Sequence, residues 1–522
     1  MKFISKILLT VSLLVFAYGC TDLSENLYSE ILQEDFFKTE NEVIAAIAPV
    51  YGNLRAFTNS TWELSTHSTD QTLTPEKALG HWAGSNWPLM NSHKWIPSMG
   101  LFNSAWNDQY ALVNNSNKII YQLEGIESMD EELKSLFLAE LKMIRGFGYY
   151  NLIDLFGNVP LVTSWIVEDE TPPTVQRAEV FNYAVNDIEA NVENLSEKVD
   201  ASTYGRFNKY SGYALLAKYY LNAEVWSATP QWDKVIEYCD KIIASEKYSL
   251  TDKYFDNFLI KNEGSKENIF VIPYDELYTN SWGVNLTFAW RALHYAHGAK
   301  YDFKMTPWNG FTAVPAFIHS FDSADKRLDG WLIGQQYGKS GEELFCSQES
   351  NGKPLNLTID YENIYNPDDG IEYGPSYALE FMGARFAKYE YGPCDISMGN
   401  DFAVFRYADV LLMKAEALMR KNGGVANAEA VNLVNSVRSR AFDDPSKLYT
   451  ASTLTLDALI AERGWELYGE GTRRTDLVRF GRFIKGTWEF YDRSWEDEKH
   501  NLYPIPYSQI SANPDLAQNP GY

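Results

Sequence analysis

The amino-acid sequence predicts a mostly α-helical protein with a loop-rich region that carries short strands. Three observations support this prediction. Apolar residues recur at helical spacing through long parts of the chain, and a helix-pair pattern of similar layout occurs twice. Residues 58–107 and 263–404, in contrast, are punctuated by Gly, Pro, Asn and Ser. We therefore expect a helical scaffold on which loops and small hairpins are mounted.

The first expected helix begins after Thr39, because Thr39 and Glu42 form a capping box. Its apolar face carries Val43, Ile44, Ile47, Tyr51 and Leu54. Pro49 is expected to kink it. A second helix is predicted from Glu131 up to the loop at 156–160, and a third is predicted over 181–195, where apolar residues step by three and four.

An internal repeat is predicted further along the chain. Leu215-Leu216-Ala217-Lys218 is followed after twenty residues by Val235-Ile236, and Leu411-Leu412-Met413-Lys414 is followed at the same offset by Val431-Asn432. Each unit is interpreted as two helices joined by a polar turn. These units resemble tetratricopeptide helix pairs, which stack because one pair cannot bury its own apolar face. Antiparallel helix pairs of another kind remain the alternative.

The two irregular stretches are interpreted as loops and small hairpins. Ile269-Phe270-Val271-Ile272 is predicted to be a short strand. Long loops inside a compact protein usually carry function, because binding residues concentrate on them.

Composition excludes several classes of function. The formal net charge of −25 argues against a nucleic-acid binder, which needs a basic surface to neutralise phosphates. Aromatic residues reach 15%, which favours surfaces that stack flat ligands. The four cysteines (Cys20, Cys239, Cys346 and Cys394) form no C-x-x-C pair, so neither a zinc site nor a dense disulfide framework is predicted. Nucleotide-binding and serine-hydrolase motifs do not occur, and no cofactor or metal is predicted.

The N-terminus has the pattern of an export signal. Lys2 and Lys6 precede an apolar run over 7–16, and Ala17-Tyr18-Gly19 precede Cys20. This pattern predicts a signal peptide over 1–19 and resembles the bacterial lipobox, whose cysteine is lipidated to become the first residue of the mature protein. Cys20 is therefore the expected lipidation site. An ordinary secretory peptide and a short signal anchor are the alternatives.

Four ordered segments resemble the SusD/RagB family of Bacteroidetes outer-membrane nutrient-binding lipoproteins. They are RGFGYYNLIDLFGNVPL (145–161), RYADVLLMKAEA (406–417), ERGWEL followed by EGTRRTDLVR (462–479), and YPIP through QNPGY (503–522). Gly146 departs from the family pattern, which has Ala there. The resemblance implies an N-terminal SusD-like region over 20–225 and a C-terminal SusD/RagB region over 226–522 that carries the ligand-binding insertions.

The same resemblance implies a function. Such a protein would bind a glycan at the cell surface, without cleaving it, and deliver it to a SusC-like TonB-dependent transporter. Cys20 would anchor it in the outer membrane, and the tetratricopeptide-like side is the candidate transporter contact. The number of tryptophans on loops favours an extended pyranose chain such as a plant β-glucan or hemicellulose, with starch and host glycans left open. A peptide-binding RagB-like protein is the alternative.

The expected ligand site lies where tryptophans gather in the irregular stretches. Nine tryptophans fall in two windows, with about half of them expected to be buried: Trp62, Trp82, Trp87, Trp95 and Trp106, then Trp282, Trp290, Trp308 and Trp331. Trp82, Trp282 and Trp308 are the best platform candidates because small or polar residues flank them. Trp290 and Trp87 come next. Polar partners are expected from Asp70, Asn86 and Arg291, and also from Gln71, His81, Asn91, Asn285 and Asn309.

Two other groups of residues are weaker candidates. Glu462 and Glu466 would be the carboxylate pair of a secreted glycoside hydrolase, but adjacent basic residues are expected to keep both ionised. His294 and His297 stand three residues apart, a spacing that metal ligands use, but the sequence shows no third ligand nearby.

Overall fold

Helices form most of the protein, as the apolar spacing predicts. A computed structural model describes residues 39–77, 82, 86–166, 171–347, 352–362, 364–366, 371–373, 378–484 and 493–522. Its helices are α3 (Glu40–Asn53), α4 (Thr61–His67), α5 (Asn86–Asn91), α6 (Gly100–Glu124), α7 (Glu131–Phe156), α8 (Arg177–Asn191), α9 (Lys209–Leu221), α10 (Ala223–Ser227), α11 (Trp232–Ala244), α12 (Phe288–Ala292), α13 (His297–Lys300), α14 (Pro315–His319), α15 (Tyr407–Lys421), α16 (Ala428–Arg438), α17 (Leu456–Leu467), α18 (Arg473–Arg479) and α19 (Tyr507–Ala512). Within the described part of the chain, no helix is both long and apolar enough to span a bilayer.

The N-terminal cap has the predicted geometry. The amide of Glu42 donates to Thr39 Oγ1 at 3.3 Å, and the amide of Thr39 donates to Glu42 Oε2 at 2.8 Å. Helix α3 continues through Pro49 to Asn53, and Val43 and Ile47 on its predicted apolar face are buried. The helix predicted from Glu131 is also confirmed and extends to Phe156.

Helix α7 packs closely against α8 because of Gly146. A Cβ atom at this position would lie 2.7 Å from Ile188 Cδ1, so a larger residue would force the Ile188 side chain to move. The glycine at which this chain departs from the family pattern is therefore a packing position.

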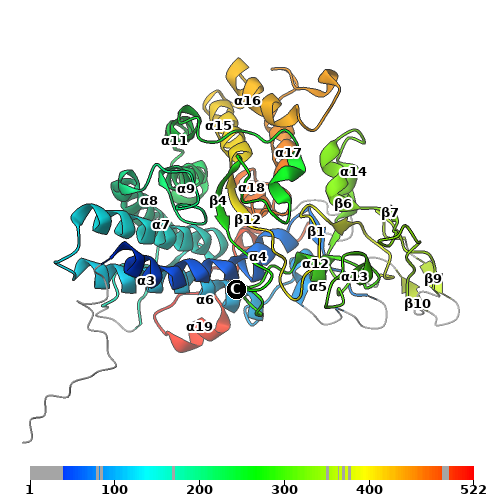
Figure 1. Cartoon of the computed structure of the whole chain (residues 1–522), viewed down its shortest axis with the longest axis horizontal. Helices are drawn as coiled ribbons and strands as arrows, with labels where there is room; N and C mark the ends of the chain where they lie inside the picture. Colours follow the sequence, from blue (N-terminus) through cyan, green and yellow to red (C-terminus); the bar gives the residue numbers. More distant parts are fainter. Residues whose placement is uncertain are drawn as a thin grey trace, which may run out of the picture.

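The predicted helix pairs are present and stack on one another. Helices α9 and α11 form the first pair, α15 and α16 form the second, and α11 contacts α15. Figure 1 shows helices α7, α8, α9 and α11 on one side of the molecule and α15 to α17 above its centre. The predicted boundary between 20–225 and 226–522 falls inside α10. Helix α9 of the first region packs against α11 of the second, so helices from both regions lie in one layer.

The strands are short and pair only two by two among the described residues. They are β1 (Thr72–Leu73), β2 (Val159–Pro160), β3 (Thr174–Val175), β4 (Asn268–Ile272), β5 (Thr312–Ala313), β6 (Trp331–Leu332), β7 (Gly334–Gln335), β8 (Asn356–Leu357), β9 (Ile364–Asn366), β10 (Ile371–Tyr373), β11 (Arg385–Phe386) and β12 (Phe402–Arg406). The antiparallel pairs are β1 with β5, β2 with β3, β4 with β12, β6 with β11, β7 with β8, and β9 with β10.

Most of these strands lie in the predicted irregular region. The strand expected at 269–272 is β4, which is confirmed. In Figure 1 the strands β7, β9 and β10 and the short helices α12 to α14 lie on the side of the molecule opposite α7 to α9. The scaffold and the insertion-rich part are thus spatially separate, as the sequence predicts.

Candidate functional site

A strand pair joins the two tryptophan windows. Thr72 of β1 pairs with Ala313 of β5, and Leu73 pairs with Thr312. The segment that follows β1 and the segment that precedes β5 therefore lie side by side, although some 240 residues separate them in the chain. This pairing brings Trp82 and Trp87 next to Trp308 and Phe311.

Three predicted platform residues form one cluster. The rings of Trp282 and Trp308 are stacked, with centroids 5.7 Å apart and planes 22° apart. Trp82 also lies next to Trp308, at 6.5 Å and 52°, and its Nε1 donates to the Trp308 carbonyl at 3.0 Å. Trp282 is 58% exposed, whereas Trp82 and Trp308 are half-buried. The three indole planes are thus tilted relative to one another, and Trp282 is the most exposed of the three rings.

The backbone beneath Trp308 is held by a second segment. The amide of Trp308 donates to the Trp290 carbonyl at 2.6 Å, and the amides of Gly310 and Phe311 donate to the Arg291 carbonyl at 2.8 and 2.7 Å. These hydrogen bonds fix residues 308–311 against 290–291. The direction of the Trp308 ring is therefore set by main-chain contacts.

The prediction that Trp290 is a platform residue is wrong. Its side chain is completely buried, and its Nε1 donates to the Ile396 carbonyl at 3.0 Å. A ligand has no access to a ring that is packed on all sides. Trp290 instead supports Trp308 through its carbonyl. Four more of the nine tryptophans in the two windows are also buried: Trp62, Trp95, Trp106 and Trp331. This confirms the prediction that about half of the nine are core residues.

Trp87 and Arg291 lie beside the cluster rather than on its outer face. The guanidinium of Arg291 lies 5.8 Å from the Trp87 ring centroid and 5.7 Å from that of Phe311, and it forms an ion pair with buried Glu63. Burial lowers the pKa of Arg291 to about 10, so the group stays cationic at neutral pH. Both residues are half-buried, and they connect the cluster to the core.

His67 closes the base of this aromatic group. Its ring lies 4.0 Å from the Phe311 centroid and 5.2 Å from that of Trp87, and the side chain is fully buried. Burial lowers the pKa of His67 to about 3, so the ring is neutral at physiological pH.

The predicted polar partners are mostly engaged elsewhere. Asp70 forms a bidentate ion pair with Arg473, at 2.8 and 2.6 Å, so its carboxylate serves the contact between this loop and α18. Asn86 is the half-buried first residue of α5 and stays a candidate. The following side chains are buried: Gln71, Asn91, Asn285 and Asn309. His81 and Cys20 lie outside the described residues.

Two residues of the cluster were missed by sequence reasoning. Phe311 is buried in the centre, in contact with Trp62, Trp82, Trp87 and His67. Gly310 lies directly under Trp82, because a Cβ at Gly310 would lie 2.4 Å from Trp82 Cζ2. The signal that could have identified them is the sequence Trp-Asn-Gly-Phe at 308–311, in which a glycine directly precedes the second of two aromatic residues.

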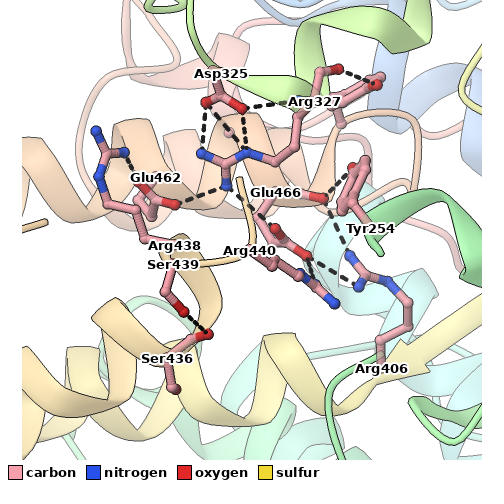
Figure 2. Close-up of polar contacts among 12 residues, drawn as sticks. Tyr254, Asp325, Arg327, Arg406, Ser436, Arg438, Ser439, Arg440, Glu462 and Glu466 are labelled. Carbon is pink, nitrogen blue, oxygen red and sulfur yellow. Dashed lines mark hydrogen bonds and ion pairs between the residues drawn. The ribbon is translucent and has the colours of Figure 1, made fainter. Parts of the chain in front are cut away.

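The alternative carboxylate pair is buried within an ion network. Arg327 Nη1 lies 2.7 Å from Glu462 Oε1 and 3.2 Å from Glu466 Oε2, as Figure 2 shows. Glu466 also pairs with Arg440 and Arg406, at 2.5 and 3.1 Å. Burial by itself would raise the pKa of Glu466, but the three arginines hold that pKa below its ordinary value. Both carboxylates are completely buried, so they are not accessible to a polysaccharide.

His294 lies close to Cys346 and Glu380, a group that the spacing of His294 and His297 in the sequence did not indicate. Ligand atoms of His294, Cys346 and Glu380 lie within 4.8 Å of one another, and all three residues are buried. The amide of Ala296 donates to His294 Nδ1 at 3.1 Å, so the ring proton is on Nε2, 2.9 Å from Glu380 Oε2.

This hydrogen bonding does not suit a metal ion. A metal on Nε2 would move the ring proton to Nδ1, where it would face the Ala296 amide. Burial also raises the pKa of Cys346 to about 12, so its thiol is protonated in the metal-free protein. We therefore interpret His294 and Glu380 as a structural hydrogen-bonded pair next to Cys346.

Known proteins share the sequence and the architecture of this chain. Residues 244–522 match the model described as the SusD family, and residues 27–221 match one described as "Starch-binding associating with outer membrane". The starch-binding protein SusD of Bacteroides thetaiotaomicron is 25% identical over 83% of this chain and 81% of its own length. SusD-like protein P25 of Formosa agariphila is 24% identical over 99% of both chains.

Solved structures have the same fold. A laminarin-binding SusD-like protein superposes with a TM-score of 0.72 at 22% identity, covering 93% of this chain and 100% of the other. A surface glycan-binding protein A of Bacteroides thetaiotaomicron, solved with laminarihexaose, gives a TM-score of 0.72 at 20% identity, covering 92% and 99%.

Proposed function

Because this chain belongs to the SusD family, we propose that it is a glycan-binding protein whose platform is the cluster of Trp82, Trp308 and Trp282. The observation that carries the proposal is the outward-facing Trp282 ring, 58% exposed and stacked on Trp308. An indole face held in this way offers a flat apolar surface to the C–H face of a pyranose. Neighbouring polar groups then serve the hydroxyls.

The tilt between the rings favours a particular shape of ligand. Trp282 is stacked on Trp308 at 22° and Trp82 is tilted from Trp308 by 52°, so the rings of Trp282 and Trp82 are tilted relative to one another and sugars stacked on both must turn. A glucan that coils meets this requirement better than a flat ribbon. The similarity to proteins described as laminarin-binding and starch-binding supports the same choice.

Affinity electrophoresis tests this proposal. Native protein is run through gels that contain laminarin, starch, a mixed-linkage β-glucan or a hemicellulose, and we expect retardation by at least one of them. Trp282→Ala should abolish most of the retardation, because a stacked aromatic contributes ~1 kcal/mol or more. Trp165→Ala is the matched control, since Trp165 is 43% exposed on a different loop. Wild-type mobility that is unchanged in every gel would refute glycan binding.

We further propose that the protein hands the glycan to a SusC-like TonB-dependent transporter without cleaving it. The burial of Glu462 and Glu466 among arginines supports the absence of hydrolysis at that pair. Incubation with the retarding polysaccharide should release no new reducing ends. Pull-down from cells that produce a SusC-like transporter tests delivery, and a failure of the two proteins to co-purify would contradict it.

A further inference from the structure

A short turn next to the platform holds an aromatic ring in solvent. Tyr278 is 88% exposed and Leu277 is 72% exposed, four and five residues before Trp282. The Cα atoms of Tyr278 and Trp282 therefore lie within about 14 Å of one another, the span of a fully extended segment of that length. The turn presents Tyr278 in the neighbourhood of the outermost platform ring.

The turn is held by its own hydrogen bonds. Asp275 Oδ1 accepts from the amides of Leu277 and Tyr278, at 2.7 and 2.9 Å. Thr279 Oγ1 accepts from the Asp275 amide at 3.0 Å and donates to the Asp275 carbonyl at 2.6 Å. The two amides also lower the pKa of Asp275, which keeps its carboxylate ionised as an acceptor. The backbone at Tyr278 is thereby fixed although its side chain is exposed.

The same segment of chain supports the turn and the platform. The amide of Ile396 donates to Asn280 Oδ1 at 3.1 Å, and Thr279 Oγ1 lies 2.8 Å from Ser397 Oγ. The carbonyl of Ile396 accepts from Trp290 Nε1 at 3.0 Å, and Trp290 in turn holds Trp308. The turn and the platform are thus fixed to one support, so the backbone at Tyr278 keeps its place relative to the tryptophan cluster.

We propose that Tyr278 forms an outer sugar-binding subsite that is used only by ligands longer than the tryptophan cluster can cover. The proposal rests on the glycan-binding function proposed above. A ring on a fixed backbone loses little conformational freedom on binding, and its hydroxyl can pair with a sugar hydroxyl while the ring stacks. Leu277, its exposed neighbour, offers neither a flat face nor a hydrogen-bonding group.

The test is the dependence of affinity on oligosaccharide length. Isothermal titration is carried out with laminari-oligosaccharides or malto-oligosaccharides, according to which polysaccharide retards the wild type. We expect Tyr278→Ala to bind the hexasaccharide about fivefold more weakly than wild type. Its affinity for the disaccharide should be unchanged. Leu277→Ala should match wild type at both lengths, and Tyr278→Phe should keep most of the affinity for the longer ligand.

Three results would overturn the outer subsite. Equal affinity of Tyr278→Ala and wild type for the hexasaccharide would show that the ring is not used. An equal loss at both lengths would place Tyr278 in the central site. A wild type that binds no polysaccharide would overturn the proposed function and the subsite together. Electrophoresis of the wild type alone distinguishes this outcome from a failure of the subsite only.

Discussion

Gly310 lies beneath the indole of Trp82, and its lack of a side chain makes that contact possible. A Cβ there would lie 2.4 Å from Trp82 Cζ2 and 2.8 Å from the Arg291 carbonyl oxygen, which belongs to the backbone and has little freedom to move. The whole displacement therefore falls on Trp82. The absence of a side chain at Gly310 thus allows the Trp82 indole to pack against the backbone at this position.

We predict that Gly310→Ala displaces Trp82 and weakens binding of the retarding polysaccharide about fivefold, through the loss of one stacked ring. Affinity electrophoresis measures the effect, and circular dichroism checks that the helix content is kept. Gly264→Ala is the control, because a Cβ at Gly264 has no neighbouring atom within 4 Å. Unchanged retardation of Gly310→Ala would show that Trp82 does not touch the glycan.

Asp401 couples stability to pH. It is 7% exposed, accepts from the Tyr274 amide at 3.0 Å and bonds to the Tyr204 hydroxyl, and burial raises its pKa from 3.8 to about 6. The folded state therefore holds this proton more tightly than the unfolded chain does. Stability falls as the pH rises from 3.8 to about 6, by about 3 kcal/mol for this group alone.

Asp401→Asn removes this dependence, because an amide does not ionise and still offers an acceptor and a donor. We expect the variant to unfold at a higher temperature than wild type near pH 7.5, with the difference shrinking towards pH 4. Calorimetry at both pH values measures it. A constant difference at the two pH values would contradict the raised pKa.

Among the elements, β12 and α17 are joined by buried charges. Arg406 ends β12 and pairs with Glu267, with Glu466 at 3.1 Å and with Glu470 at 2.7 Å, all of them buried. Arg440 pairs with Glu267 as well, so two cations face that carboxylate. Each charge is compensated only while the whole network is intact.

We predict that Arg406→Met lowers the free energy of unfolding by about 3–5 kcal/mol, because it removes a buried cation that three buried carboxylates share. Arg482→Met is the control: Arg482 pairs with Asp457 at the exposed surface, where such a pair contributes at most about 1 kcal/mol. Urea unfolding followed by tryptophan fluorescence compares them. Similar midpoints for the two variants would show that the network is dispensable for stability.

For the whole molecule, attachment to the membrane is proposed to depend on Cys20. Two or three acyl chains hold a protein stably on a bilayer, whereas one chain binds only marginally. We expect Cys20→Ala to move the protein from the membrane fraction to the soluble fraction of fractionated cells. Cys239→Ala, which alters a buried thiol, is the control. Retention of Cys20→Ala in the membrane would contradict the lipid anchor.

Local features could be predicted from the sequence because neighbouring residues set them. The Thr39–Glu42 cap, the helix that begins at Glu131 and the strand at 269–272 each depend on residues within a few positions of one another. Helix pairing was also predictable, since two apolar faces of the same period must cover one another. Gathering of tryptophans in two loop windows indicated the region of the candidate site.

Which tryptophan is exposed was decided only by the tertiary structure. Trp290 and Trp308 stand in one window among similar residues, yet Trp290 is fully buried, whereas Trp308 is half-buried and stacked on the exposed Trp282. Asp70 is committed to Arg473, some 400 residues further along the chain. By itself the sequence determined the helical scaffold, the family and the wealth of aromatic residues. Tertiary contacts between distant segments, such as that of Trp290 with Ile396, determined which of them face outward, because burial depends on partners that the chain brings together only on folding.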